Sequence, residues 1–459
     1  MPAVWSANES GSRSGLMTPG GDDVGGDSDT SPGTPRKRRG HGLMPAPLSS
    51  PASWQVCAAC SARLSEADPR TVCACGGLLE VRHHAPRASG PELRALFDAR
   101  RSPDASGVWR FAEMVLPGAV AAAVSRPEGN TPLVESGPVS RWTGLEWLRL
   151  KEEGLNPTGS FKDRGMTVGI TQARRIGAAA VACASTGNTA ASMSAYAALA
   201  GIPALVVIPA GQVAMGKLAQ SVAYGARTLL VRGDFDACFS LVREAADRLG
   251  VYVLNSINPF RVEGQKTIVL EMLQQLGWEP PDWIVVPAGN LGNTAAFGKA
   301  LREAREWGLI SRAPRLAAVQ AAGAAPFARS FREGFARRHK VKAETVATAI
   351  RIGDPASYDR AVAAIRETNG VVAEVTDAEI LEAKSTVDRA GIGCEPASAA
   401  SVAGARRLVR EGTIGPRDRV VAVLTGHVLK DPDTLLRGSR LTEIEPSLSA
   451  LEAALRQTG

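Results

Sequence analysis

From residue 108 onward, short apolar runs rich in β-branched residues alternate with longer stretches in which apolar positions recur every three or four residues. The short runs are typical of buried strands, and the longer period is typical of amphipathic helices. Strands are expected at residues 179–185, 203–209, 227–233, 251–256, 282–287, 315–320 and 419–426. Helices are expected between them, for example over residues 189–201, 235–250 and 264–277. This alternation predicts βαβ units and an α/β fold with parallel sheets.

Unusual polar residues follow several of these strands. STGN follows the first, NSIN the fourth, AGNLGN the fifth and TGH the last. Parallel strands joined by right-handed crossovers leave ligand sites at their carboxyl ends. The chemistry of the protein is therefore expected at these four places.

The segment GNLGNT, residues 289–294, follows a predicted strand and opens a predicted helix. Glycines let backbone N–H groups approach a phosphate closely, and a helix N-terminus supplies partial positive charge. An ordinary tight turn between strand and helix would contain the same glycines. The spacing matches neither the dinucleotide-binding GxGxxG nor the GK[ST] ending of a P-loop, so it indicates a different phosphate ligand.

Lys162 lies in NPTGSFKDRG, where Pro157 and Gly159 predict a turn and Ser160 is a candidate helix cap. The lysine then falls in the first turn of a helix. The positive end of a helix lowers the pKa of a nearby amine, which favours a role as nucleophile in a Schiff base. Taken alone, the lysine and the charges after it are also explained as exposed residues of a first turn.

Six segments resemble, in order and spacing, those of the threonine synthase family. They fall within roughly residues 125–435 and are LNPTGSFKDRGM, ACASTGNTAAS, NSINPFRVEGQKT, PAGNLGNT, CEPASAASVAG and LTGHVLKDP. The resemblance implies pyridoxal phosphate (PLP) as cofactor and the fold-type II architecture of tryptophan synthase β, with two three-layer α/β domains around the cofactor. It also implies a lyase of threonine biosynthesis that converts O-phospho-L-homoserine and water to L-threonine and phosphate by elimination and hydration.

The resemblance assigns roles around the cofactor. Lys162 would carry PLP covalently and act in catalysis, and Asn188 would donate a hydrogen bond to the 3′ oxygen. Thr425 would face the pyridine nitrogen, where a hydroxyl, unlike a carboxylate, does not hold the ring protonated. The residues implied for the PLP phosphate are Gly289, Asn290, Gly292, Asn293 and Thr294.

Substrate contacts are implied at two places. A polar loop would hold the α-carboxylate through Ser185, Thr186, Asn188 and Thr189. Ser185 or Thr189 would also cap the following helix. Arg261 would form a charge-assisted fork with the substrate phosphate, together with Asn255 and Ser256. The alternative is that Arg261 is an ordinary first-turn residue. Glu395 and His427 are expected near the site without a direct role.

Four cysteines lie close together in the sequence: Cys57, Cys60, Cys73 and Cys75. Four thiolates suit tetrahedral Zn²⁺, and the CxxC half resembles the zinc ribbon that precedes some threonine synthases. The second half is CxC, which would either strain the tetrahedron or mark a site that has lost its metal. A zinc ion held here would be structural, because four protein ligands leave no open position.

These patterns divide the chain into units. The predicted units are a disordered tail (1–53), a zinc-ribbon-like segment (54–84), a large PLP-binding domain (108–155 and 262–440), a small α/β domain (156–261) and a C-terminal helix (441–459). The tail is rich in Gly, Ser and Pro, and its basic run RKRR is expected to be solvated.

Composition narrows the possible partners. Hydrophobic residues make up 44% and charged residues 22%, and no run reaches the roughly 18 apolar residues of a membrane helix. The formal charge of +7 comes largely from arginines scattered over amphipathic helices, so neither nucleic acid nor membrane is expected. The remaining cysteines occur singly, which favours a reducing compartment and hence the cytoplasm. A homodimer is expected.

Two alternatives stay open on the sequence. One is another fold-type II enzyme, such as a threonine or serine dehydratase or a β-replacing synthase. The other is a catalytically silent regulatory homologue with the cysteine segment as an interaction module, which the complete set of catalytic motifs disfavours.

Overall fold

The computed structural model describes residues 52–100, 106–211, 215–432, 434 and 442–456. Residues 1–51 of the predicted tail, with its basic run, lie outside these ranges; residues 52 and 53 are described, and Ser53 already belongs to a strand, so the predicted end of the tail is too late. Within the described ranges, no helix is both long and apolar enough to cross a membrane.

The larger sheet has six strands in the order β12-β11-β10-β13-β5-β4. All neighbours are parallel except β4 and β5. The last strand in the sequence, β13, lies between β10 and β5. The strands are β4 (Leu133–Val134), β5 (Trp147–Glu152), β10 (Trp283–Pro287), β11 (Arg315–Ala321), β12 (Val371–Val375) and β13 (Arg419–Leu424).

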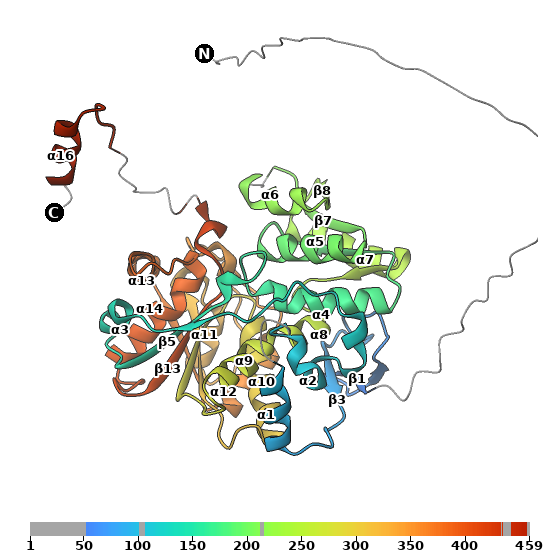
Figure 1. The fold of residues 1–459 in the computed structure, drawn as a ribbon. Helices are drawn as coiled ribbons and strands as arrows, with labels where there is room; N and C mark the ends of the chain where they lie inside the picture. The colour runs from blue at the N-terminus through green and yellow to red at the C-terminus, as the bar shows by residue number, and fades with distance from the viewer. Residues whose placement is uncertain (1–51, 101–105, 212–214, 433, 435–441, 457–459) are drawn as a thin grey trace, which may run out of the picture. The chain divides into compact units, whose positions relative to one another are not determined.

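The smaller sheet has four parallel strands in the order β8-β7-β6-β9. Its strands are β6 (Ala180–Ala184), β7 (Ala204–Pro209), β8 (Arg227–Val231) and β9 (Val251–Val253). Helices α5 and α7 pack against its strands, and α14 packs against the larger sheet (Figure 1).

The helices follow the strands in the alternating order that the sequence predicts. They are α1 (Gly90–Ala99), α2 (Ala112–Val115), α3 (Gly137–Thr143), α4 (Lys162–Arg175), α5 (Asn188–Ala200), α6 (Met215–Ala223), α7 (Phe235–Leu249), α8 (Pro259–Gln265), α9 (Thr267–Gln275), α10 (Gly292–Glu306), α11 (Pro326–Arg332), α12 (Tyr358–Glu367), α13 (Asp377–Arg389), α14 (Pro396–Arg410) and α16 (Leu448–Arg456). Short 3₁₀ turns are η1 (Trp109–Phe111), η2 (Pro117–Ala122), η3 (Glu153–Leu155), η4 (Ala322–Ala324), η5 (Thr348–Ile350) and η6 (Val428–Lys430).

A third, antiparallel sheet holds the cysteine segment. Its order is β2-β1-β3, with β1 (Ser53–Cys57), β2 (Arg63–Ser65) and β3 (Leu79–His83). We call residues 53–83 the ribbon. Strand β3 of the ribbon packs against α8.

The α/β fold class is confirmed, and each of the seven predicted strands is present. The helix predicted over residues 264–277 is instead two helices, α8 and α9, which meet at Lys266. Asn258 explains the earlier start, because its Oδ1 accepts hydrogen bonds from Phe260 N and Arg261 N. The boundary between the two predicted α/β domains stays a prediction.

Candidate active site

The loop before α4 is fastened to the end of β13. Phe161 N donates a hydrogen bond of 3.0 Å to Thr425 O, and His427 N donates one of 2.9 Å to Gly159 O. Ser160 and Gly426 form an isolated antiparallel bridge between them. Two segments far apart in the sequence are therefore joined at the carboxyl end of a central strand, where the sequence predicts the chemistry.

Lys162 begins α4 directly after this bridge. Its Nζ lies 3.9 Å from the centre of the Phe161 ring. Burial lowers the pKa of Lys162 to about 7; the charge of Arg261 acts in the same direction, and Glu395 opposes both. Such a lysine is largely unprotonated just above neutral pH, as an amine nucleophile must be.

The charged residues after Lys162 hold the start of α4 in place. The Arg164 side chain is fully buried and forms ion pairs of 2.7 Å with Glu153 and 2.8 Å with Glu271. Asp163 is also buried, and burial raises its pKa to about 6. The alternative that these residues are exposed first-turn charges is therefore wrong.

The glycine-rich turn connects β10 to α10. Leu291 has a left-handed φ of 62°, and a Cβ on Gly289 would lie only 2.8 Å from Ile350 Cα. Thr294 Oγ1 and Asn293 Oδ1 are buried and have no hydrogen-bond partner among the described residues. Buried polar atoms without partners are costly, so this helix N-terminus fits an oxygen-rich ligand such as a phosphate.

Asn290 links this turn to the residues implied for the substrate phosphate. Its Nδ2 donates a hydrogen bond to Ser256 Oγ, and its Oδ1 accepts one of 2.6 Å from Ala356 N. Asn255 exchanges two hydrogen bonds of 3.1 Å with the backbone of Ala184 at the end of β6. The structure thus brings Ser256 to the turn, whereas the Asn255 amide holds two strand ends together.

Arg261 is a fully buried cation on α8. Its Nη1 donates a hydrogen bond of 3.0 Å to Leu254 O, while Nε and Nη2 have no partner among the described residues. Burial lowers its pKa to about 10. The α4 glycines make room for it, since a Cβ on Gly169 would lie 3.3 Å from Arg261 Cγ. An ordinary first-turn arginine would be solvated, so this alternative does not describe Arg261.

Two side-chain contacts at the site were not anticipated. Asn188 Nδ2 donates hydrogen bonds to both carboxylate oxygens of Glu395, the residue that precedes α14. Thr425 Oγ1 lies 3.0 Å from Ser398 Oγ. No local sequence pattern predicts either pair, although Ser398 lies within the segment CEPAS that carries the family resemblance.

The loop over residues 185–189 is partly buried at the start of α5. The predicted caps are wrong: α5 begins at Asn188 without a side-chain cap, and Ser185 Oγ accepts a hydrogen bond of 3.3 Å from Gly187 N. In the described part of the chain the hydroxyls of Thr186 and Thr189 make no hydrogen bond. Helix α4 also lacks a side-chain cap, and the buried Ser160 Oγ has no partner among the described residues.

The four cysteines form a separate cluster in the ribbon. All four Sγ atoms lie within 4.8 Å of one another, with 3.4 Å between Cys57 and Cys75 and 3.7 Å between Cys60 and Cys73. Tetrahedral zinc with Zn–S bonds of about 2.3 Å needs S–S distances near 3.8 Å. The backbone amide of Cys60 contributes most to lowering the pKa of Cys57, to about 6. The cluster fits a single zinc ion, and the CxC half keeps its sulfurs within reach.

Comparison with known proteins identifies the chemistry of this arrangement. Residues 124–426 match the family model "Pyridoxal-phosphate dependent enzyme". Threonine synthase from Methanocaldococcus jannaschii is 43% identical over 388 residues, which are 84% of this chain and 95% of that one. Threonine synthase from Mycobacterium tuberculosis is 48% identical over 312 residues, which are 68% of this chain and 84% of that one.

The solved structure of threonine synthase from Escherichia coli has the same fold. Its TM-score is 0.66 at 21% identity, over 87% of this chain and 94% of that one. Maize serine racemase also shares the fold, with a TM-score of 0.58 at 21% identity over 73% and 96% of the two chains. With the sequence matches above, this shows that the chain belongs to the threonine synthase family of pyridoxal-phosphate-dependent enzymes.

Proposed function

We propose that this enzyme converts O-phospho-L-homoserine and water to L-threonine and phosphate at the site around Lys162. The observation that carries the proposal is Arg261, a fully buried guanidinium with two nitrogens that lack hydrogen-bond partners in the described structure. An unpaired buried cation is costly unless an anion compensates it. A phosphorylated substrate supplies that anion, whereas a substrate with only a hydroxyl would leave the cost in place.

The residues around Lys162 fit PLP. The helix N-terminus with the unpartnered Thr294 hydroxyl suits the cofactor phosphate, and the Thr425 hydroxyl suits a ring nitrogen that is not held protonated. When bound, PLP supplies an electron sink that stabilises negative charge on the carbons next to the amino group. The protein supplies binding, orientation and proton transfer.

Lys162 is proposed to move the proton at the substrate Cα. With a pKa of about 7, its Nζ accepts and returns a proton at little cost near neutral pH. A second proton leaves Cβ and phosphate departs from Cγ; a proton then adds at Cγ to form the methyl group, water adds its hydroxyl at Cβ, and Cα regains a proton to give threonine. Arg261 and Ser256 are proposed to hold the phosphate, and the loop over residues 185–189 to hold the α-carboxylate.

Three further parts of the proposal concern the protein as a whole. The cysteine cluster is proposed to hold one structural zinc ion, which its sulfur separations support. The enzyme is proposed to act in the cytoplasm, supported by its free cysteines. It is also proposed to form a homodimer.

The decisive experiment incubates the purified protein with PLP and O-phospho-L-homoserine and measures phosphate and threonine together. The two products should appear in equal amounts. Parallel incubations with L-serine and L-threonine test for the ammonia and oxo acid that a dehydratase would form. Deamination without threonine formation would replace this proposal with the dehydratase alternative.

A further inference from the structure

Helix α8, which carries Arg261, is held from two sides. It has only seven residues, and a helix this short is not stable without packing. On one side it touches α4 so closely that a Cβ on Gly264 would overlap Arg164 O. On another side it packs against β3 of the ribbon. The position of Arg261 therefore depends on contacts that lie outside the active site.

One buried hydrogen bond joins the ribbon to α8. His83 Nε2 lies 2.8 Å from Glu263 Oε2, and both side chains are almost wholly buried. Burial lowers the pKa of His83, so the ring is neutral at neutral pH. Burial alone would raise the pKa of Glu263, but Lys266 and Lys299 outweigh it and hold that pKa well below its ordinary value. An ionised carboxylate only accepts, so His83 Nε2–H is the donor.

The other ring nitrogen fixes this arrangement. Ser53 Oγ lies 2.8 Å from His83 Nδ1 and donates to it, because Nδ1 carries no proton in this tautomer. Ser53 and His83 are paired residues of β1 and β3. The two strands of the ribbon thus set the direction in which the histidine donates.

Glu263 also connects the ribbon and α8 to α10. Lys266 Nζ lies 2.5 Å from Glu263 Oε2, and Lys299 on α10 forms an ion pair with Glu263 Oε1. Lys299 Nζ donates a further hydrogen bond to Val81 O of β3. Helix α10 begins at the turn proposed for the cofactor phosphate, and α8 carries Arg261. One carboxylate is therefore bonded to both helices and to the ribbon.

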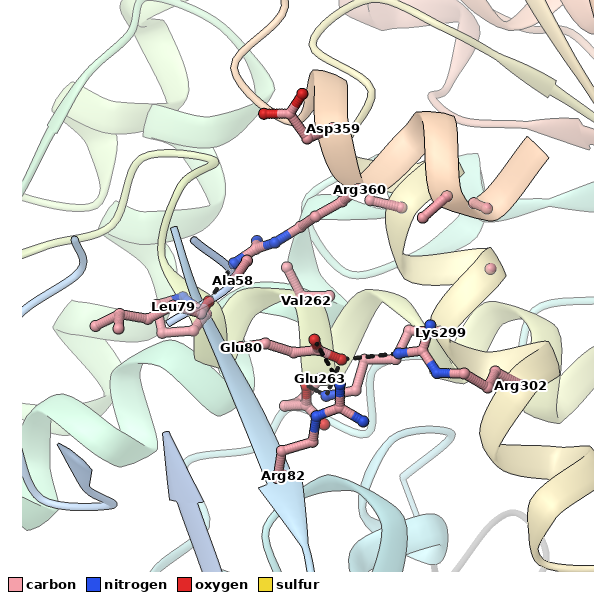
Figure 2. A pocket seen from close by; sticks show the side chains of 15 residues that line it. Ala58, Leu79, Glu80, Arg82, Val262, Glu263, Lys299, Arg302, Asp359 and Arg360 are labelled. Carbon is pink, nitrogen blue, oxygen red and sulfur yellow. Dashed lines mark hydrogen bonds and ion pairs between the residues drawn. The ribbon is translucent and has the colours of Figure 1, made fainter. Parts of the chain in front are cut away.

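A partly open pocket lies beside the packed contact between β3 and α8. It has a volume of about 350 Å³ and is lined by residues of β3, α8, α10 and α12. Glu263 and Lys299 form an ion pair at its wall, and Figure 2 shows Arg360 extending from α12 toward Leu79. A cavity lacks the dispersion contacts of a packed interface. Polar links around this pocket therefore help to hold the ribbon on the helices, among them the 2.8 Å ion pair of Arg302 on α10 with Glu80 of β3, whereas His83–Glu263 is the one that reaches α8.

We propose that the ribbon is a positioning element of the active site, in which His83 acts through Glu263 to fix α8 and with it the Arg261 guanidinium. The inference rests on the proposed role of Arg261 in binding the substrate phosphate. It gives the ribbon a function in substrate binding in addition to any contribution to stability.

Three substitutions in the full-length, PLP-loaded enzyme test this role. His83→Leu removes the donor, His83→Gln retains an N–H near the position of Nε2, and His84→Leu alters the neighbouring histidine, which packs on Trp54. Amide hydrogen exchange over residues 259–265 should be faster in His83→Leu than in the parent. The KM for O-phospho-L-homoserine should rise roughly two- to thirty-fold in the same variant with a smaller change in kcat. His83→Gln should recover most of both effects, and His84→Leu should resemble the parent.

The outcomes are distinct. Parent-like exchange over residues 259–265 and parent-like KM in His83→Leu would overturn the positioning role. If the parent does not turn over O-phospho-L-homoserine at all, the proposed function falls, and the exchange measurement by itself still decides whether His83 holds α8. If His83→Leu does not fold, Ser53→Ala, which leaves Nδ1 without its donor, should show the same changes to a smaller degree. Absence of any change there would overturn the proposal.

Discussion

Asn188 Nδ2 donates hydrogen bonds of 3.1 and 3.3 Å to the carboxylate of Glu395, joining the first residue of α5 to the residue before α14. Burial raises the pKa of Glu395, and the Asn188 hydrogen bond opposes this. Glu395 in turn raises the pKa of Lys162, against burial and Arg261. The charges of Arg261 and Glu395, from two different segments, thus set the protonation of the Lys162 amine together with its burial.

The pH dependence of PLP attachment should reflect these opposing effects on the pKa of Lys162. The neutral amine is the nucleophile, so the rate of PLP attachment to cofactor-free protein should rise with pH through about 7 and then level off. Glu395→Gln removes a charge that raises the pKa of Lys162, so its midpoint should move to lower pH. Arg261→Gln removes a charge that lowers it, so its midpoint should move to higher pH.

Stopped-flow absorbance between about pH 5.5 and 9 measures these midpoints, across the range where the lysine titrates. Glu411→Gln, an exposed carboxylate on the surface beyond α14, is the matched control and should leave the midpoint unchanged. Shifts of the same sign in the Glu395 and Arg261 variants would contradict the electrostatic account.

Replacing Lys162 with Ala should abolish turnover, because no other described lysine combines a helix start with a lowered pKa at this site. Borohydride treatment of the parent followed by peptide mass spectrometry should find the reduced cofactor on Lys162. Lys340→Ala changes an exposed lysine and should keep full activity. If reduced cofactor is found on another lysine in the Lys162→Ala protein, that lysine and not Lys162 forms the covalent link to PLP.

Replacing Arg261 with Ala should lower kcat/KM for O-phospho-L-homoserine about ten- to a hundred-fold, the loss of a charge-assisted contact worth roughly 1.5 to 3 kcal/mol. Arg261→Lys should recover only part of the loss, because a point charge does not reproduce a bidentate fork. The absorption spectrum of bound PLP should hardly change in either variant. Full kcat/KM in the Ala variant would remove Arg261 from the phosphate site.

Measurements of thermal stability should distinguish a role of Arg261 in ligand binding from a role in folding. In the substrate-free protein Arg261 is buried with two unpaired nitrogens, so Arg261→Met should keep or raise Tm. Inorganic phosphate should raise the Tm of the parent by binding its native state, and should do so much less in the variant. A large loss of Tm in Arg261→Met would instead assign this arginine a structural role.

The cysteine cluster should contain one zinc ion per chain. Metal analysis of protein purified without chelator measures this directly, and Cys60→Ser should lose the metal whereas Cys238→Ser, outside the cluster, should keep it. Chelation should make the ribbon sensitive to protease before the rest of the chain unfolds. Metal-free protein from such a purification would favour the view that the CxC half no longer binds zinc.

The seven strands predicted from apolar runs are present, but β4, β5 and β12 of the larger sheet were not predicted, although β12 (VVAEV) also has an apolar run. The sequence did not predict β5, whose residues WLRLKE alternate with charges, because Lys151 is buried there through a 2.6 Å ion pair with Glu271 on α9. The single helix predicted over residues 264–277 breaks at Lys266, whose charge pairs with Glu263 and Glu303. In β5 a distant partner therefore overrides the local pattern.

The candidate site followed from the motifs, but its side-chain contacts did not. Arg261 is buried because glycines of α4 leave room for its side chain. These glycines lie about 90 residues before Arg261, so the sequence around Arg261 does not reveal its burial. The pairs Asn188–Glu395 and Ser398–Thr425 likewise join segments whose separation in sequence gives no hint of contact. The order of the motifs identifies which residues belong to the site. Which of these residues contact one another is decided by how the helices pack on the two sheets.

The central place of β13 in the larger sheet has a consequence for synthesis on the ribosome. Its partners β10 and β5 are made earlier, and each lacks a neighbour on one edge until residues 419–424 emerge. Thr425, which anchors the loop of Lys162, emerges directly afterwards. The nascent chain therefore has no complete active site until synthesis is nearly finished. A chain that stops before Arg419 exposes two parallel strand edges, which are templates for association with other chains.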